Sequence, residues 1–586
     1  MTTLRLLAVA LTCLSATTVV MAAESADLIL ISGHVITVDG NNRIAEAVAI
    51  ANGRILAVGS NAEVRALASP TARVIDLKGH TATPGLIDTH AHIANGGLGL
   101  VYSVELGDAT SIKEVQRRVA VRAATLKRGE WLQGEGWDEG KLAEHRYILA
   151  SDLDRVAPLN PVWLDHTTGH YGVANSAALK LAGIGASTPN PPAGTIDRDA
   201  FGKPSGVLKE GARDMMLAVL PRTSPDAWQK GISAAIDLMH REGMTGVKDP
   251  DISPEIWDAY LALARAGRLS AHVCVLWHTD PSLESVRANI TRLGQLPKPP
   301  ASAAENLVSC GVKIFMDGSG AARTAWMYKD WNKSDREPDT GNTGYPLIDP
   351  AVYREAVRLY TAAGVHIGTH AIGDRAIDWV VDSYAAALKE RPVQALRHSI
   401  IHANTPTEHA LEVMATLQRD YDSGYPETQA EFTWWIGDNY APNLGPERRA
   451  RLNPYKTYLS RGIRWGGGSD FSVTPLAARY GLWASVARQS LNGSYGATPF
   501  GTAESVDAMT ALRSYTIWAA HQLFLDAEAG SIEPGKSADI AVWDRDPTTV
   551  PTAEISKMKC EMTLFRGAVV YLADGSPLSA ATKLSD

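Results

Sequence analysis

Cysteine is scarce in this chain. Among 586 residues the cysteines are Cys13, Cys274, Cys310 and Cys560, and Cys13 lies in an N-terminal segment that we expect to be removed. The other three are odd in number and far apart, a spacing that excludes a disulfide framework and a Cys-x-x-Cys zinc site. Cys274 and Cys310 stand in apolar runs, so we predict that both are buried core residues.

A block of basic residues is also absent. Lys and Arg number 56 against 64 Asp and Glu, which gives a net charge of -8. This balance disfavours nucleic acid and anionic membranes as partners. With 45% hydrophobic and 20% charged residues the chain is globular in composition, and its length indicates a large main body with a smaller satellite domain. We expect a small-molecule partner, and the sequence leaves a homo-oligomer open.

Residues 1–23 have the features of a secretory signal peptide. Arg5 gives the positive start, residues 6–20 form the apolar core, and Ala22 and Ala23 are small residues suited to cleavage. The apolar core is too short for a membrane span, which needs roughly 20 apolar residues. No small residue directly precedes Cys13, which argues against a lipoprotein anchor. We therefore predict a secreted or periplasmic protein without a stable membrane anchor.

Short β-branched and apolar runs, separated by Gly, Asn and Asp, occur near both ends of the chain. They are residues 28–31, 35–38, 47–50 and 55–58, and then 539–543, 562–565 and 568–571. Neither set is enough for a stable domain. We expect residues 24–83 plus 530–586 to form one small β-sandwich.

Strand-like runs alternate with amphipathic helical segments between these ends. The expected strands are 246–248, 272–277, 312–316, 365–369, 399–402 and 463–467, and the expected helices are 228–241, 353–363, 375–389 and 446–461. Repeated β-then-α units predict an α/β fold, a (β/α)8 TIM-type barrel, over residues 84–529. Residues 97–222 are more irregular, and we expect them to be an insertion over the barrel mouth.

Several histidines stand where barrel strands should end. Pro84-Gly85 marks a turn before a short strand-like run, and on a strand His90 and His92 would project to the same side and bind one divalent metal ion, for which zinc is suited. Two later pairs are four residues apart, about 13 Å on a strand, so one metal centre cannot take both members. Barrel active sites lie at the carboxyl ends of the strands, which favours His370 over His366 and His402 over His398.

A lysine and an aspartate complete the set. Lys313 has aliphatic neighbours, and a desolvated amine has a lowered pKa that makes it available to add carbon dioxide and form a metal-bridging carbamate. A lysine paired with a barrel carboxylate is the alternative, and Lys248 is a competing candidate for the bridge. Asp470 follows a glycine-rich late strand, where it can bind metal and accept a proton from water, or merely cap a turn.

The order His-x-His, Lys, His, His, Asp on successive strands resembles the amidohydrolase superfamily over nearly the whole mature chain. Residues 84–92 look like its first-strand motif and residues 530–539 like its return into the sandwich. Residues 131–138, 313–319, 323–325 and 370–376 are similar to the branch that contains N-substituted formamide deformylase. The resemblance implies one metal held by His90, His92 and Asp470, a second held by His370 and His402, and a bridge formed by carboxylated Lys313, which favours Lys313 over Lys248.

Two departures from that family pattern lie near the expected pocket. Residues 432–435 stand where relatives tend to have a Pro-x-His element, and Phe471-Ser472 replaces the more usual small residue and proline. We therefore do not transfer the substrate of any relative.

These residues predict an exported hydrolase that cleaves an amide-type C–N bond of a small molecule by a metal-activated hydroxide, with Asp470 as proton acceptor. The cofactors would be one or two divalent metal ions, zinc being favoured, and carbon dioxide for Lys313. The candidates for substrate contact are Trp137, His170, Asp317 and Arg323. The alternatives are hydrolysis of a lactone, ester or cyclic amide at the same centre, and a non-catalytic exported binding protein.

Overall fold

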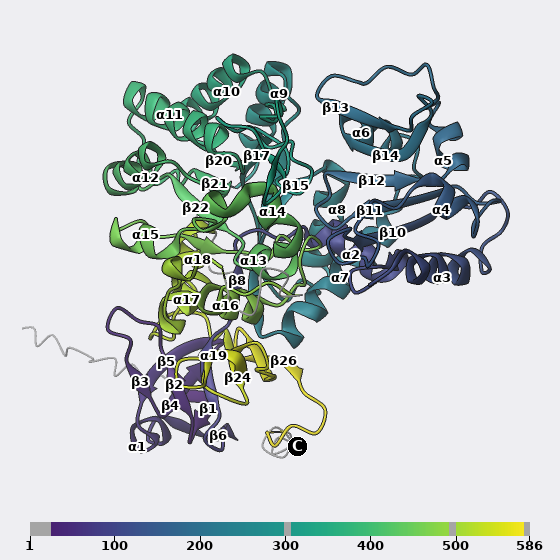
Figure 1. Ribbon diagram of the computed structural model, residues 1–586. Coiled ribbons are helices and arrows are strands. Elements are labelled where there is room, and N and C mark those ends of the chain that lie inside the picture. The colour runs from purple at the N-terminus through teal and green to yellow at the C-terminus, as the bar shows by residue number, and fades with distance from the viewer. Residues whose placement is uncertain (1–24, 298–305, 492–499, 579–586) are drawn as a thin grey trace, which may run out of the picture.

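A computed structural model describes residues 25–297, 306–491 and 500–578 (Figure 1). The predicted signal peptide, residues 1–23, lies outside this range. Within it, no helix combines the length and the apolar character needed to cross a membrane.

The centre of the described chain is a sheet of eight parallel strands. In order across the sheet they are β8 (Leu86–Asp88), β15 (Met244–Ile252), β16 (His272–His278), β17 (Leu307–Phe315), β20 (His366–Ala371), β21 (Ser399–His402), β22 (Tyr425–Thr428) and β23 (Gly466–Gly467). The two edges meet where the Thr89 N–H donates to the carbonyl of Gly467 at 3.0 Å. The predicted TIM-type barrel is confirmed.

Helices cover the outside of this barrel (Figure 1). They include α7 (Pro225–Arg241), α8 (Pro254–Arg265), α9 (Leu283–Leu293), α10 (Pro350–Ala362), α11 (Asp374–Glu390) and α12 (Glu408–Tyr421), followed by α16 (Ala478–Ala487), α17 (Ala508–Ser514) and α18 (Ile517–Gln522). Their starts are encoded locally: the Ser224 side chain accepts the N–H of Ala227 and Pro225 occupies the first turn of α7. Three of the four predicted helices are confirmed.

The prediction of one helix over residues 446–461 is wrong. The structure has α13 (Glu431–Trp435), α14 (Gly437–Arg449) and, after a break, α15 (Tyr455–Ser460). Asn453 has a φ of 50°, and Pro454, which has no N–H for a helical hydrogen bond, precedes α15. Strand β22, rich in polar residues, was not predicted.

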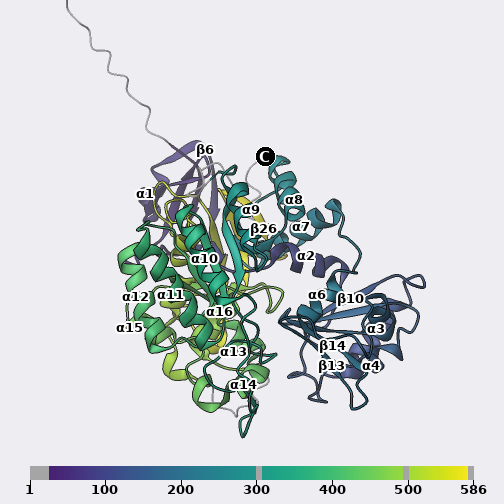
Figure 2. The ribbon, with the colours of Figure 1, turned by 90° about the horizontal axis from the view of Figure 1, so that it is seen from above.

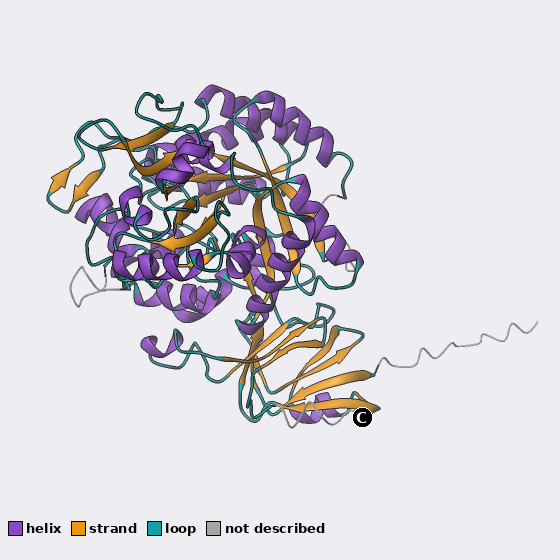
Figure 3. Cartoon of the chain, turned by 90° about the vertical axis from the view of Figure 1, so that its right-hand side faces the viewer, coloured by secondary structure: helices purple, strands orange, loops and turns teal. Residues whose placement is uncertain are grey.

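Both chain ends build one β-sandwich, which lies below the barrel in Figure 3. One sheet has the order β5 (Arg54–Gly59), β4 (Ala47–Ala51), β1 (Ala26–Ile31), β6 (Ala68–Asp76), and α1 (Asn61–Arg65) connects β5 to β6. The other has the order β26 (Ala568–Leu572), β25 (Cys560–Phe565), β24 (Ile540–Trp543), β7 (Thr81–Pro84), β2 (His34–Ile36), β3 (Ile44–Ala45). Because β7 pairs with β24, the composite sandwich is confirmed.

The insertion is more regular than its sequence indicated. Its sheet has the order β13 (Gly194–Arg198), β14 (Pro204–Glu210), β12 (Tyr171–Ala174), β11 (Val162–His166), β10 (Leu132–Trp137), β9 (Val104–Glu105), and its helices are α3 (Ile112–Ala123), α4 (Ala150–Asp154), α5 (Ser176–Leu181) and α6 (Gly211–Leu217). Short strands interrupted by glycine, such as Gly134 and Gly136 in β10, hide the period-two pattern. Figure 2 shows this layer beside the barrel.

A disulfide joins Cys274 on β16 to Cys310 on β17. Both side chains are buried, as predicted, but the sequence was expected to contain no disulfide framework and did not indicate this one bridge. The two residues are 36 positions apart, yet neighbouring parallel strands bring their Cα atoms to 5.6 Å. Cys560 is a buried free thiol.

Candidate metal centre

His90 and His92 lie just after β8, in the loop before α2 (Ile93–Tyr102), rather than on the strand as expected. Their Nε2 atoms are each 3.3 Å from Oδ1 of Asp470, which follows β23. A buried carboxylate, Asp88, ties the two loops together. It accepts the N–H of His90 at 2.8 Å and both the N–H and the hydroxyl of Ser469, at 3.0 and 2.6 Å.

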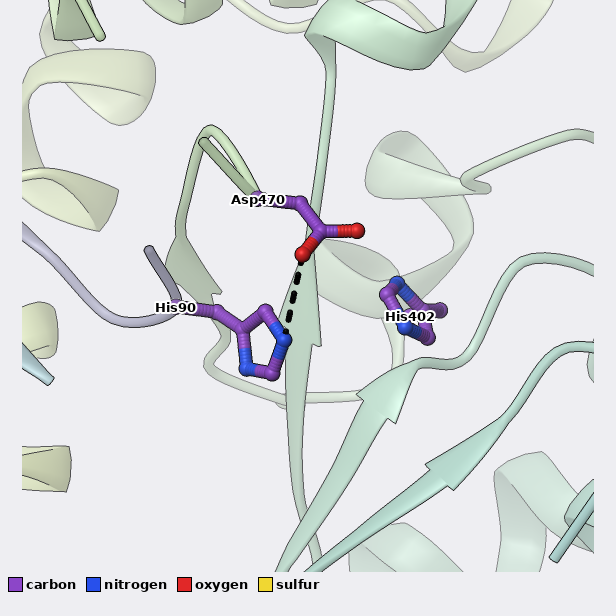
Figure 4. Close-up of side chains that lie close together, drawn as sticks. All are labelled: His90, His402 and Asp470. Atoms are coloured by element: carbon purple, nitrogen blue, oxygen red, sulfur yellow. Dashed lines mark ion pairs between the residues drawn. The ribbon is translucent and has the colours of Figure 1, made fainter. Parts of the chain in front are cut away.

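The other predicted ligands reach the same place from neighbouring strands. His370 and His402 stand at the carboxyl ends of β20 and β21, and Nε2 of His402 is 2.9 Å from Nδ1 of His370. Nζ of Lys313, on β17, is 3.4 Å from Nε2 of His90. Figure 4 shows His90, His402 and Asp470 turned toward one another. The structure thus brings all six predicted ligands to one mouth of the barrel.

His366 and His398 stay out of this centre. His366 lies 3.0 Å from the carbonyl oxygen of Leu396 through Nδ1, and Nε2 of His398 is 3.2 Å from the Thr361 hydroxyl. These contacts agree with the structural role expected for both.

Burial and neighbouring charges shift the pKa values of these ligands. Burial lowers the pKa of Lys313 to about 8, and it lowers the pKa of His370 and His402 well below the ordinary histidine value. Burial alone would raise the pKa of Asp470, but the adjacent imidazoles of His90 and His92 outweigh it and hold that pKa well below its usual range. Two neutral imidazoles, a carboxylate and an amine that deprotonates near pH 8 result.

Two imidazole lone pairs face each other in this centre. Nε2 of His370 is 3.0 Å from the carbonyl oxygen of Gly318, and Nδ1 of His402 is 2.7 Å from Oε1 of Gln429. Both contacts require an N–H, so a neutral ring leaves Nδ1 of His370 and Nε2 of His402 without a proton. Two acceptors 2.9 Å apart repel unless a cation lies against them.

The donor set therefore fits a divalent metal. His90, His402 and Asp470 offer ligand atoms that all lie within 4.8 Å of one another. Oδ1 of Asp470 is buried and has no well-aligned hydrogen-bond donor in the described ranges. Nitrogen and carboxylate donors in this number suit zinc and similar ions.

Two buried residues of this centre, Glu427 and Gln429, were not predicted from the sequence, because strand β22 was not predicted. Gln429 follows β22 and orients His402. Glu427, on β22, pairs with Lys248 of β15, and both side chains are fully buried. The ammonium of Lys248 is thus already paired with a carboxylate, which leaves Lys313 as the lysine nearest the histidines.

The four residues predicted to contact substrate do not share one role. His170, in the insertion, lines the cavity above the centre, and its ring lies 5.1 Å from that of His370. Its Nδ1 is 2.9 Å from Oε2 of Glu210, a buried residue that no local signal in the sequence marks.

Trp137, Asp317 and Arg323 are not among the residues that line that cavity, and their contact with substrate stays a prediction. Trp137 is fully buried and donates its indole N–H to the carbonyl of Leu164. Arg323 pairs with Asp339 at 2.9 Å. Asp317 has no exposed surface and accepts three backbone N–H groups, those of Trp326, Ile372 and Gly373, so it fixes the loop after His370.

Apolar side chains close the cavity over the metal ligands. Its walls include Ile372, Phe432, Ile436, Tyr440 and Val473. Phe432, one of the departures from the family pattern, stacks on His402 with ring centroids 5.6 Å apart and an interplanar angle of 21°. A substrate at the ligands would therefore meet an apolar, water-poor wall.

Several known proteins are similar to this chain over most of its length. Residues 73–571 match the sequence pattern of the amidohydrolase family. The chain is 30% identical over 564 residues to N-substituted formamide deformylase from Arthrobacter pascens, covering 94% of this chain and 99% of that protein. An uncharacterized metal-dependent hydrolase from Pyrococcus furiosus has a similar structure, with a TM-score of 0.66, 26% identity and coverage of 89% and 100%. One from Pyrococcus horikoshii shares the fold, with a TM-score of 0.68, 24% identity and coverage of 90% and 99%. The chain therefore belongs to the amidohydrolase family, and it is a metal-dependent hydrolase acting on carbon–nitrogen bonds.

Proposed function

We propose that the protein is an exported enzyme that hydrolyses an amide-type C–N bond of a small molecule. The observation that carries the proposal is the convergence of His90, His92, Asp470, His370 and His402 with Lys313 at one mouth of the barrel. The similarity to N-substituted formamide deformylase supports an N-substituted amide as the substrate class.

The metal-holding roles follow the grouping of the side chains. His90, His92 and Asp470 would hold one divalent ion, zinc being favoured, and His370 and His402 would hold a second. When bound there, a divalent metal lowers the pKa of a water molecule and polarises a substrate carbonyl. Lys313 would link the two groups of ligands once its neutral amine has added carbon dioxide. A bond forms between Nζ and the carbon, one proton leaves to solvent, and the resulting carbamate presents two oxygens.

Asp470 handles the proton of the reaction. Its carboxylate accepts the proton of the attacking water and returns it to the nitrogen of the departing amine when the C–N bond breaks. His170 and Glu210 position the substrate. When the Nδ1–H of His170 is donated to Glu210, Nε2 of the same ring is free to accept a hydrogen bond from a substrate N–H. The apolar walls keep bulk water away from these charges.

Export is supported by two features of the chain. Residues 1–23 have the composition of a cleaved signal, and the Cys274–Cys310 disulfide belongs to an oxidising compartment. Intact-mass measurement of the protein from culture medium or periplasm tests this. We expect a mature start near residue 23 and one pair of thiols that alkylates only after reduction. A full-length, fully reduced cytoplasmic protein would refute export.

The activity is tested with a panel of amides, esters and lactones. The purified enzyme is assayed as isolated, after chelation and after addition of zinc, manganese or cobalt. We expect hydrolysis of amides that is lost on chelation and restored by metal. Turnover of esters or lactones alone would replace the proposed bond type, and metal binding without any turnover would identify a binding protein.

A further inference from the structure

A fully buried ion pair lies behind the metal ligands, inside the barrel. Lys248 comes from β15 and Glu427 from β22, and the ammonium of Lys248 contacts Oε1 of Glu427. Both side chains have no exposed surface. Burying two charges costs free energy, and apolar residues of similar size often stabilise a protein as well or better. A buried ion pair therefore calls for a role other than filling space. The hydrolysis described above uses neither residue.

The second oxygen of Glu427 faces a metal ligand. Oε2 lies 3.8 Å from Nδ1 of His90. Across the described part of the chain, neither of these two buried atoms has a hydrogen-bond partner. The carboxylate oxygen is an acceptor, and Nδ1 of His90 is a donor when it carries the proton of the ring, so the two atoms are then complementary. Their separation exceeds a hydrogen-bond distance by less than about one ångström.

The other nitrogen of His90 faces the metal centre. Its Nε2 is 3.3 Å from Oδ1 of Asp470 and 3.4 Å from Nζ of Lys313. A histidine binds metal through an unprotonated nitrogen, so the proton of His90 must reside on Nδ1, where it needs an acceptor.

The same strand already orients a second ligand in this way. Gln429 is two residues beyond Glu427, and its Oε1 lies 2.7 Å from Nδ1 of His402. Residues two apart along an extended chain point to the same side, so the end of β22 presents two acceptors, one to each histidine.

The geometry points to Glu427 as a positioning residue: it accepts the Nδ1–H of His90 and thereby presents Nε2 to the metal, while Lys248 keeps the carboxylate ionised and in place. The pair is neutral overall, so it orients His90 without adding charge to the centre. This inference rests on the proposed role of His90 as a metal ligand.

Two matched double variants test the inference. Lys248→Met with Glu427→Gln removes both charges but keeps an acceptor for His90, whereas Lys248→Met with Glu427→Leu removes the acceptor as well. Metal dissociation constants are measured on the apo-proteins by competition with a chelator, and thermal unfolding of the apo-proteins reports the fold. We expect the leucine double variant to bind metal about 10–100-fold more weakly than the glutamine one, the usual effect of losing an outer partner of a ligand. Equal affinities would overturn the inference.

Two further measurements keep the outcomes separate. His90→Gln must itself weaken metal binding; if it does not, the proposed metal centre fails, and with it this inference. If His90→Gln weakens binding but the two double variants match, only the role of Glu427 fails. Should the double variants not fold, a crystal structure of the metal-loaded wild type decides. We expect Nδ1 of His90 and Oε2 of Glu427 within about 3.2 Å, and a separation that stays beyond hydrogen-bond reach would refute the role.

Discussion

Nε2 of His402 lies 2.9 Å from Nδ1 of His370, and neither nitrogen carries a proton when both rings are neutral. Such a pair is destabilising by itself, because two lone pairs point at each other in a buried site. Cation binding converts that repulsion into two favourable contacts, so the metal-free and metal-loaded proteins should differ in stability.

Metal binding should raise the free energy of unfolding. At a free metal concentration 100 times the dissociation constant the gain is about 2.7 kcal/mol. We expect His370→Asn with His402→Asn to lose the part of this gain that comes from the ion at these two histidines. Chemical denaturation of apo-protein with and without zinc measures it. A zinc effect of the same size in wild type and double variant would show that the metal binds elsewhere.

Asp470→Asn should separate metal binding from catalysis. The amide keeps the shape of the side chain and one oxygen near His90 and His92, but it cannot take up a proton. We expect metal content to stay largely intact while kcat falls by about 10²–10⁴-fold. Metal analysis and steady-state kinetics on the same preparation check this. Asp382→Asn, an exposed acid on α11, is the matched control and should be silent. An Asp470→Asn enzyme with wild-type turnover would refute the proton-transfer role.

Activity should depend on carbon dioxide through Lys313. Burial lowers the pKa of Lys313 to about 8, so a substantial part of its amine is neutral in the mildly alkaline range, and the neutral amine is the form that adds carbon dioxide. We expect apo-protein reloaded with metal in carbon-dioxide-free buffer to recover activity only after bicarbonate is added. Lys313→Gln should stay inactive in both buffers. Full recovery without bicarbonate would exclude the carbamate.

His170 should favour substrates that carry an N–H. In His170→Asn the amide nitrogen takes the place of Nδ1 and keeps the hydrogen bond to Glu210, while the acceptor at Nε2 is lost. One hydrogen bond to a polar group is worth about 1–3 kcal/mol when its loss leaves a partner unsatisfied, which corresponds to a five- to 150-fold lower kcat/KM for a secondary amide. The ester with the same acyl group should change little. Equal losses for both substrates would indicate a structural role only.

The sequence predicts those parts of the centre that follow a strict local rule. β17, β20 and β21 carry β-branched runs, and the rule that active sites lie at the carboxyl ends of barrel strands selects His370 and His402 over the histidines four residues earlier. Asp470 follows from its place at the end of a late strand, whereas Lys313 was chosen for its aliphatic neighbours and by the family resemblance. β8 is only three residues long and the sequence does not mark its end, so His90 and His92 were expected on the strand although they lie just after it.

The rest depends on contacts that no local pattern records. The run Pro426-Glu427-Thr428-Gln429 has no apolar alternation, so β22 and both of its acceptors were missed. His170 meets Glu210 across 40 residues, and Cys274 meets Cys310 only because their strands are neighbours. Asp317 and Trp137 were candidates because both have polar groups and lie in motifs similar to those of the family. In the structure these polar groups form hydrogen bonds with backbone groups.

Stability should fall as the pH rises past neutrality because of His521. This histidine lies on α18, with Nε2 at 2.7 Å from Asp422 and Nδ1 at 2.9 Å from Asp526, so both nitrogens face carboxylates. Burial lowers the pKa of His521 and so does nearby Arg397, but the two carboxylates outweigh them and raise it above 6.5. A raised folded-state pKa gives stability that is complete below about 6.5, the unfolded value, and is lost as the pH rises through the folded value.

His521→Gln should remove that pH dependence. We expect the variant to lose about 1–2 kcal/mol of unfolding free energy at pH 6, where the wild-type ring is charged, and less as the pH rises through the raised pKa of His521 in the folded protein. Urea denaturation at pH 6, 7, 8 and 9 measures the difference. His409→Gln is the control, because His409 also pairs with an aspartate but half of its side chain is exposed, where such a pair contributes little. A His521 variant whose deficit stays constant from pH 6 to 9 would show that the ring contributes by packing and not by charge.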